Sequence, residues 1–226
     1  MNIYPFRIIL VNYLLLLISL TFHEWGHAWA AHKLGDNTPQ QQGRLSLNPL
    51  VHIDLIGTII LPLIMMLFVT PLGIWGWAKP VEFNINNFKN KKFGDLLVIL
   101  AGPASNLLLA LFAAIAANTI FRNNGPISGL MGNILFLNCL LFVFNMLPIP
   151  PLDGSCLLKK VFHVTEETYL YISQWGFVTI LILLQLPFVN KILLICIKMA
   201  MGFIYMLSEL ICWPLHALSH SISGFL

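Results

Sequence analysis

Charged side chains are scarce in this sequence. Only 9% of its 226 residues are Asp, Glu, Lys or Arg, whereas 58% are hydrophobic. A soluble globular domain has about a quarter charged residues, so this chain cannot cover itself with a polar surface. Its 12 Lys and Arg residues give a net charge of +3, too little for a nucleic-acid-binding surface. The sequence therefore predicts a protein solvated by the lipid bilayer, with no nucleic acid among its partners.

Cysteine is also sparse, and it lacks the spacing of a framework. The four cysteines form no C-x-x-C pair, and three of them lie in strongly apolar stretches; they are Cys139, Cys156, Cys196 and Cys212. This distribution favours small core side chains over disulfide bonds.

Apolar stretches that could cross a bilayer recur along the chain. A hydrocarbon core about 30 Å thick needs roughly 20 residues of helix. Such stretches lie at about 8–31, 53–77, 96–120, 130–147, 169–186 and 192–213. Only short polar connections separate them, and no internal repeat is visible. We predict an all-α polytopic membrane protein with about five to six transmembrane helices, forming one membrane-embedded domain over residues 1–226.

The second apolar stretch, residues 53–77, differs from the others because it contains Pro62, Pro71 and several glycines. Proline removes a helical hydrogen bond and clashes with the preceding turn. Irregular backbone is tolerated at membrane depth only where protein covers it or where it lines a wet cavity. By its own composition this stretch could be a re-entrant hairpin or a kinked span.

Residues 23–27, in the first apolar stretch, read His-Glu-Trp-Gly-His. Positions i and i+4 share a helix face, so His23 and His27 can bind one ion together, and zinc accepts imidazole nitrogen. Glu24 can reach a water polarised by that ion and act as general base. Polar groups of this kind are costly inside a membrane helix, which favours function over a chance match.

A third ligand is expected because catalytic zinc sites have three protein ligands and one open position. Residues 145–154 read Asn-Met-Leu-Pro-Ile-Pro-Pro-Leu-Asp-Gly, so the fourth stretch ends at a rigid turn. Asp153 could complete the site, or it could cap a following helix. Considered with the two histidines, we favour Asp153 as a ligand and Zn²⁺ as the cofactor.

These motifs resemble those of the site-2 protease family of intramembrane metalloproteases. That family pairs H-E-x-x-H with N-x-x-P-x-P-x-x-D-G on a later helix, and residues 145–154 match the second pattern. The family also has a G-x-x-x-[N/S/G] stretch between the two, which residues 102–106 match. The resemblance extends over about 14–162, within a motif core of about 8–162.

The resemblance implies that His23, His27 and Asp153 hold zinc, that Glu24 is catalytic, and that the substrate is a membrane-spanning or membrane-bound peptide. Two other functions stay open: a non-proteolytic zinc-binding membrane regulator and a metal transporter. An intact Glu24 argues against the regulator, because a structural metal site needs no base. The lack of an internal repeat argues against the transporter.

Three further polar residues are candidates for contacts with substrate or for support of the site. Asn145 could hold a substrate backbone or help to stabilise an oxyanion. Asn106 could serve the site or form an ordinary interhelical hydrogen bond. His52 could approach the metal from a hairpin, or lie at the membrane interface.

The ligand set also constrains the topology. If residues 53–77 form a hairpin, the first and fourth helices end on the same face, where His27 and Asp153 can meet, whereas a full span would separate them. The ligand set therefore favours a re-entrant hairpin near 53–77. The connecting loops on that face then contain eight Lys and Arg residues, and the opposite side contains two. If residues 53–77 span the membrane, the Lys and Arg residues are also divided unequally between the two sides. The charges alone therefore do not distinguish a hairpin from a span. Since Lys and Arg accumulate in cytoplasmic loops, we predict a multi-pass protein of the cell membrane with its active site toward the cytoplasm.

Overall fold

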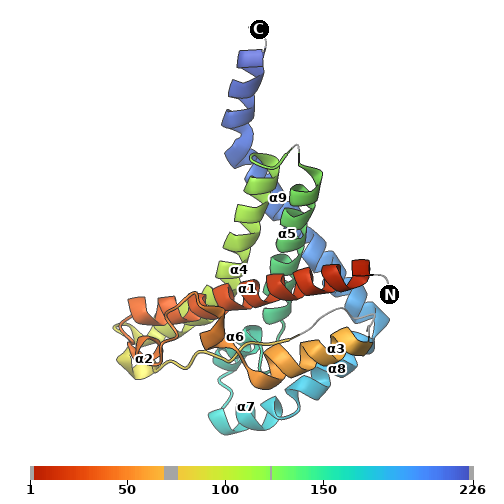
Figure 1. The fold of residues 1–226 in the computed structure, drawn as a ribbon. Coiled ribbons are helices and arrows are strands. Elements are labelled where there is room, and N and C mark those ends of the chain that lie inside the picture. The colour runs from red at the N-terminus through yellow and green to blue at the C-terminus, as the bar shows by residue number, and fades with distance from the viewer. Residues whose placement is uncertain (1–2, 69–75, 123, 224–226) are drawn as a thin grey trace.

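The fold consists of helices joined by short irregular segments (Figure 1). The computed structural model describes residues 3–68, 76–122 and 124–223, and no strand occurs among them. In chain order the elements are α1 (Ile3–Lys33), α2 (Thr38–Gln41), η1 (Pro49–His52), η2 (Leu55–Ile60), α3 (Leu61–Phe68), η3 (Ile85–Asn87), α4 (Lys91–Asn118), α5 (Gly125–Asn145), α6 (Asp153–Val161), α7 (Glu166–Ser173), α8 (Gly176–Gln185) and α9 (Pro187–Ser223). The predicted all-α fold class is confirmed.

Four helices in the described part of the chain are long and apolar enough to cross a bilayer. They lie at Arg7–Lys33, Phe93–Asn118, Gly125–Asn145 and Pro187–Pro214. Helices α7 and α8 form a pair bent by 51°, which is a fifth span if the two count as one. Each coincides with an apolar stretch of the sequence, so the protein is a polytopic membrane protein. Six spans, the upper end of the prediction, are not reached among the described residues.

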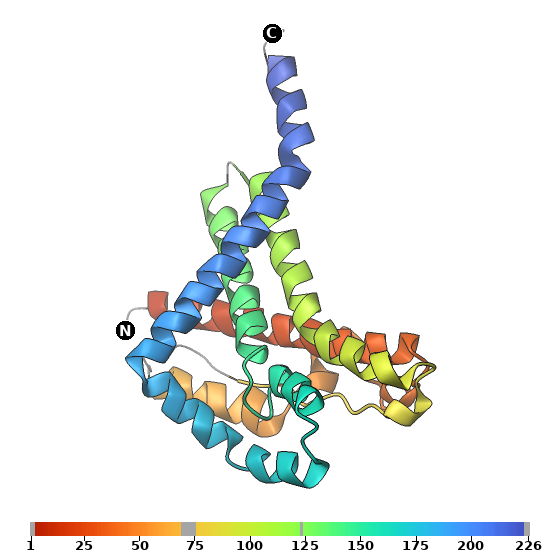
Figure 2. The ribbon, with the colours of Figure 1, turned by 180° about the vertical axis from the view of Figure 1, so that it is seen from behind.

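Helices α4, α5 and α9 form the largest buried cluster, and α9 runs obliquely past the other two (Figure 2). The cluster contains Ala110, Ala114, Leu135, Cys139, Ile197 and Ile204. Small alanines let membrane helices approach closely, which strengthens van der Waals packing between them. On the opposite side of α4, Leu108 and Phe112 are each 67% exposed, as suits side chains that face lipid.

Helix α1 crosses α4 and α5 rather than running alongside them (Figure 1). Its middle packs on α5 through Leu16, Leu20 and Leu141, and its C-terminal part packs on α4 through Ala30, Ala31 and Val98. The His-Glu-Trp-Gly-His motif lies between these two contacts. The motif therefore lies where α1 packs against both α4 and α5.

Residues 53–77 do not cross the bilayer as a single helix. The described helical part, η2 and α3, runs from Leu55 to Phe68 and is about 21 Å long at 1.5 Å per residue, which is about two thirds of a hydrocarbon core. The two ends of this segment lie together, because the Trp77 N–H donates to the Gly57 carbonyl at 3.2 Å and the Thr58 hydroxyl donates to the Trp77 carbonyl at 2.7 Å. The described parts thus have the geometry of a re-entrant hairpin. Pro71 lies outside the described residues.

Candidate metal centre

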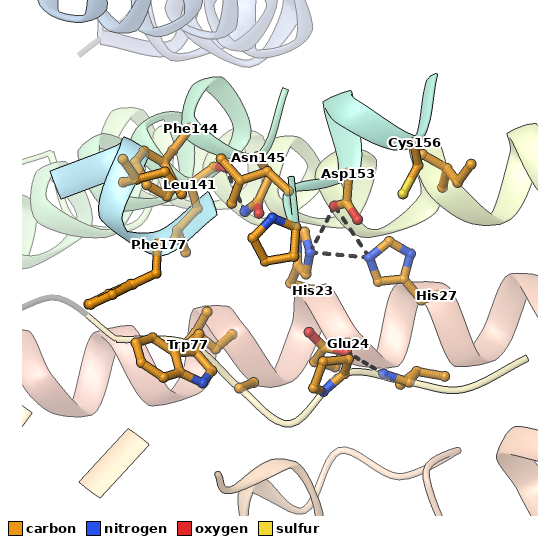
Figure 3. A pocket seen from close by; sticks show the side chains of 18 of the residues that line it. His23, Glu24, His27, Trp77, Leu141, Phe144, Asn145, Asp153, Cys156 and Phe177 are labelled. Carbon is orange, nitrogen blue, oxygen red and sulfur yellow. Dashed lines mark hydrogen bonds and ion pairs between the residues drawn. The ribbon is translucent and has the colours of Figure 1, made fainter. Parts of the chain in front are cut away.

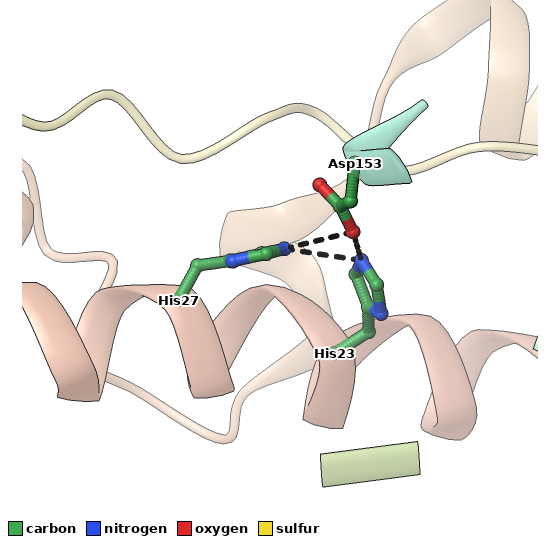
Figure 4. A group of neighbouring side chains, drawn as sticks. All are labelled: His23, His27 and Asp153. Atoms are coloured by element: carbon green, nitrogen blue, oxygen red, sulfur yellow. Dashed lines mark hydrogen bonds and ion pairs between the residues drawn. The ribbon is translucent and has the colours of Figure 1, made fainter. Parts of the chain in front are cut away.

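Three predicted ligands meet at one point between α1 and the start of α6 (Figure 4). The Nε2 atoms of His23 and His27 lie 3.1 Å apart. Asp153 Oδ2 lies 3.2 Å from the first and 3.5 Å from the second. Within the described residues, these side chains form the only group of three or more His, Cys, Asp or Glu that could hold a metal ion.

Each imidazole is oriented by its other ring nitrogen. His23 Nδ1 lies 2.7 Å from Asn106 Oδ1, and His27 Nδ1 lies 2.8 Å from the Val98 carbonyl oxygen. Both partners are oxygens that can only accept, so each Nδ1 carries the proton and donates it. The neutral imidazoles then present the Nε2 lone pairs to each other and to Asp153, as metal ligation requires.

This donor set fits a zinc ion. Bonds of about 2.0–2.1 Å in a tetrahedron separate the ligand atoms by about 3.3–3.4 Å. The three observed separations run from 3.1 to 3.5 Å. Asp153 Oδ2 is buried without a hydrogen-bond partner, and a desolvated carboxylate oxygen needs a cation or a donor to compensate it. Three protein ligands leave a fourth position for a reactant, as in catalytic sites.

Glu24 lines the same cavity, beside the irregular segment 76–84 (Figure 3). Its Oε2 accepts a hydrogen bond of 3.0 Å from the backbone N–H of Val81. The same segment is anchored at Lys79, whose N–H donates to the His52 carbonyl at 2.9 Å. Glu24 is only 9% exposed, and a backbone hydrogen bond therefore fixes its carboxylate.

Two glycines allow α1 and α4 to approach closely enough for these contacts. A Cβ at Gly102 would lie 2.2 Å from His27 Nε2, and one at Gly26 would lie 2.7 Å from the Ala101 carbonyl oxygen. The stretch 102–106 therefore has a physical role at both of its ends. Gly102 makes room for one histidine, and Asn106 binds the other.

The three candidate ligands and Glu24 line one cavity of about 1330 Å³. Drug-sized pockets usually measure about 300–1,000 Å³, so this cavity is larger than most of them. Its apolar wall includes Leu20, Leu141, Phe144, Trp77 and Phe177, and the last two rings meet edge to face at 5.6 Å (Figure 3). Charged side chains from the ends of α4, α6 and α7 line the rest, among them Asp95, Lys160 and Glu166.

The remaining predicted site residues lie in different places. Asn145 lines the cavity, and its Nδ2 donates to the Leu141 carbonyl one turn earlier at 2.9 Å. His52 is 2% exposed, and its Nε2 lies 2.8 Å from the Ser46 carbonyl oxygen. His52 is not part of the ligand group or of the cavity wall. Its side chain instead supports the loop that leads from Ser46 to His52, and its backbone carbonyl accepts from the Lys79 N–H.

Sequence reasoning missed the Val81 N–H and the Phe177 ring. A backbone donor has no residue signature, since any amino acid except proline supplies one. Phe177 lies in an apolar helix that contains no polar motif. Only its contact with Trp77 across the cavity brings it into the site.

Comparison with known proteins finds relatives that are similar to this chain over most of its length. "Putative zinc metalloprotease YwhC" of Bacillus subtilis is 32% identical over 199 residues, which cover 84% of this chain and 87% of YwhC. The chain belongs to this zinc metalloprotease family. "Putative zinc metalloprotease Rip2" of Mycolicibacterium smegmatis is 32% identical over 185 residues, covering 77% of this chain and 66% of Rip2. No model of a protein family and no solved structure matches the chain.

The family assignment agrees with the chemistry of the ligand group. The relatives are named zinc metalloproteases, and zinc is the ion that the spacing of His23, His27 and Asp153 fits. The aligned part of the chain covers most of its length, so the similarity is not limited to a short motif.

Proposed function

We propose that the chain is an intramembrane zinc metalloprotease of the site-2 type, which hydrolyses peptide bonds in membrane-embedded substrates. The observation that carries the proposal is the convergence of His23, His27 and Asp153 in the cavity that also contains Glu24. The family relationship supports the metalloprotease activity. The apolar cavity wall supports a substrate that enters from the membrane.

In this proposal each residue has a separate task. His23, His27 and Asp153 would hold zinc, which when bound would supply Lewis acidity toward a carbonyl and toward water. Glu24 accepts the proton of the attacking water and passes it to the leaving amine. The Val81 N–H fixes the carboxylate of Glu24 throughout, which reduces the entropy lost in reaching the transition state. Asn145 lies on the cavity wall, where it can bind substrate backbone.

The lining of the cavity supports this substrate class. A transmembrane helix hides its carbonyls in hydrogen bonds and must unwind locally before it can be cut. The cavity offers an apolar wall at Leu141, Phe144 and Phe177 and charged side chains at Asp95 and Lys160. A peptide that leaves the bilayer at one end matches both surfaces. The Lys and Arg residues of the loops near the site support a position toward the cytoplasmic face.

The test compares wild type with Glu24→Gln on a set of single-span membrane proteins, each tagged at both ends and mixed with purified protein in detergent. We expect tagged fragments with wild type and a rate about 10²–10⁴-fold lower with Glu24→Gln, because the general base is lost. Both proteins should contain equal zinc. A soluble unfolded protein serves as the comparison substrate and should be cut more slowly.

Equal cleavage by the two proteins would overturn the assignment of Glu24. No cleavage of any single-span protein by zinc-loaded wild type would favour a non-proteolytic role.

A further inference from the structure

A chain of buried amides extends from His23 into the contact between α1, α4 and α5. Asn106 Nδ2 donates to Asn138 Oδ1 at 2.9 Å and to the Ser19 carbonyl at 3.3 Å. Asn138 Nδ2 donates in turn to the Ser19 hydroxyl at 3.0 Å and to the Ile134 carbonyl at 2.9 Å. Asn106 and Asn138 are both 0% exposed. Every amide proton of the two side chains therefore has a partner.

The direction of this chain is fixed by its far end. The Ile134 carbonyl oxygen can only accept, so Asn138 must turn its Nδ2 toward it and its Oδ1 toward Asn106. Asn106 must then turn its Nδ2 toward Asn138, which leaves its Oδ1 facing His23 Nδ1. His23 consequently keeps its proton on Nδ1 and its lone pair on Nε2. The longer bond from Asn106 Nδ2 to the Ser19 carbonyl favours the same orientation, so a carbonyl on α5 and one on α1 together set the tautomer of His23.

We propose that Asn138 is a positioning residue for the zinc ligand His23 and that it acts through Asn106. The proposal rests on the proposed role of His23 in holding zinc. Asn138 touches neither the cavity nor the ligand atoms, and it lies outside the motifs that the sequence displays. Its effect is on the orientation of Asn106, because without this acceptor only the longer bond of 3.3 Å to the Ser19 carbonyl holds the amide against rotation. Such outer partners of metal ligands typically contribute 10–100-fold in metal affinity.

The experiment is a double-mutant cycle on zinc affinity, measured by competition with a chromogenic chelator on full-length protein in detergent. The variants are Asn138→Ala, Asn106→Ala and the double variant. Asn133→Ala, an exposed position on the same helix, is the matched control. Thermal unfolding of each protein in excess chelator reports the fold independently of zinc.

We expect Asn138→Ala to weaken zinc binding about tenfold, Asn133→Ala to leave it unchanged, and Asn138→Ala to have no further effect in the Asn106→Ala background. A merely structural contact would weaken binding by the same factor in both backgrounds, and that result would overturn the proposal. Unchanged zinc affinity in Asn138→Ala would also overturn it.

Asn138→Leu, close to asparagine in shape, carries the same prediction if the alanine variant does not fold. Wild type without zinc binding would overturn the proposed function itself, which a loss confined to the variants would not.

Discussion

At the scale of single residues, the metal centre depends on space as much as on ligand chemistry. His27 packs directly against Gly102, where a Cβ would lie 2.2 Å from its Nε2. The imidazole can swing away from such a clash at little cost to the helices, but it cannot do so and still point at Asp153. A methyl group at this position should therefore harm the site and spare the fold.

Gly102→Ala should weaken zinc binding at least tenfold, in the range typical of displaced ligands and their partners. The thermal unfolding midpoint in excess chelator should change little. Gly132→Ala is the matched control, because a Cβ at Gly132 meets nothing within 4 Å. Zinc affinity equal to that of wild type in Gly102→Ala would show that His27 does not need its observed position.

The grouping of His23, His27 and Asp153 could be predicted only in part from local signals. His23 and His27 are one helical turn apart, whereas Asp153 by itself could also cap the following helix and was favoured only because of the two histidines. The contacts of Asn138 and Val81 were not predictable, because they join segments far apart in the sequence. The place of His52 could not be predicted either. Its distance in sequence from the motifs does not tell whether its side chain binds a metal or supports a loop. The catalytic and ligand roles of all these residues stay predictions until they are measured.

At the scale of elements, the end of α1 is tied to the segment that crosses the site. Asp36, which is 0% exposed, accepts hydrogen bonds from the Asn84 backbone N–H at 2.7 Å and the Asn87 side chain at 2.8 Å. It also accepts two from Thr38. One carboxylate thus joins the turn after α1 to η3 and fixes one end of the segment that includes Val81.

Asp36→Asn should destabilise the protein by about 1–3 kcal/mol near neutral pH, because one of the two carboxylate oxygens that accept these buried hydrogen bonds becomes an amide nitrogen, which cannot accept. Burial raises the pKa of Asp36, but hydrogen bonds from Thr38, Asn87 and Asn84 outweigh it and hold that pKa below its ordinary value. Its stabilisation is therefore complete above the unfolded pKa of about 3.9 and is lost as the pH falls through the lower folded value. The difference in unfolding midpoint between wild type and variant should shrink below about pH 4.

Glu167→Gln, an exposed carboxylate of α7, is the control for that series. A difference that persists undiminished in acid would mean that the Asp36 charge is not what stabilises the turn.

The long helices were the most predictable elements. Apolar stretches of about 20 residues have few structures open to them in lipid, so α1, α4, α5 and α9 follow from composition. The hairpin needed more, since Pro62 and the glycines of 53–77 only weaken a helix. Its return was inferred from the need to bring His27 and Asp153 together, and the contact of Trp77 with Gly57 agrees with that inference. The bend between α7 and α8 had no such signal.

At the scale of the whole molecule, the hairpin decides which loops share a side of the membrane. The loops near Gln41 and Lys89 flank it in the sequence. A hairpin places both on the active-site side, and a full span would place them on opposite sides. Asn124, between α4 and α5, should lie across the bilayer from both.

Single cysteines at Gln41, Lys89 and Asn124, each in a background without the four native cysteines, test this arrangement. A membrane-impermeant maleimide applied to sealed vesicles should label positions 41 and 89 from one side and position 124 from the other. Labelling of positions 41 and 89 from opposite sides would contradict the hairpin and separate the histidines from Asp153.

The most direct measurement is the zinc content of the purified protein in detergent, compared between wild type, His23→Ala and Asp153→Ala. Asp95→Ala, an aspartate of the same cavity that pairs with Lys160, is the control. The account predicts close to one zinc per chain in wild type and in the control, and little or none in the two ligand variants. Equal zinc in wild type and Asp153→Ala would contradict it, because the ion would then not join α1 to the turn after α5.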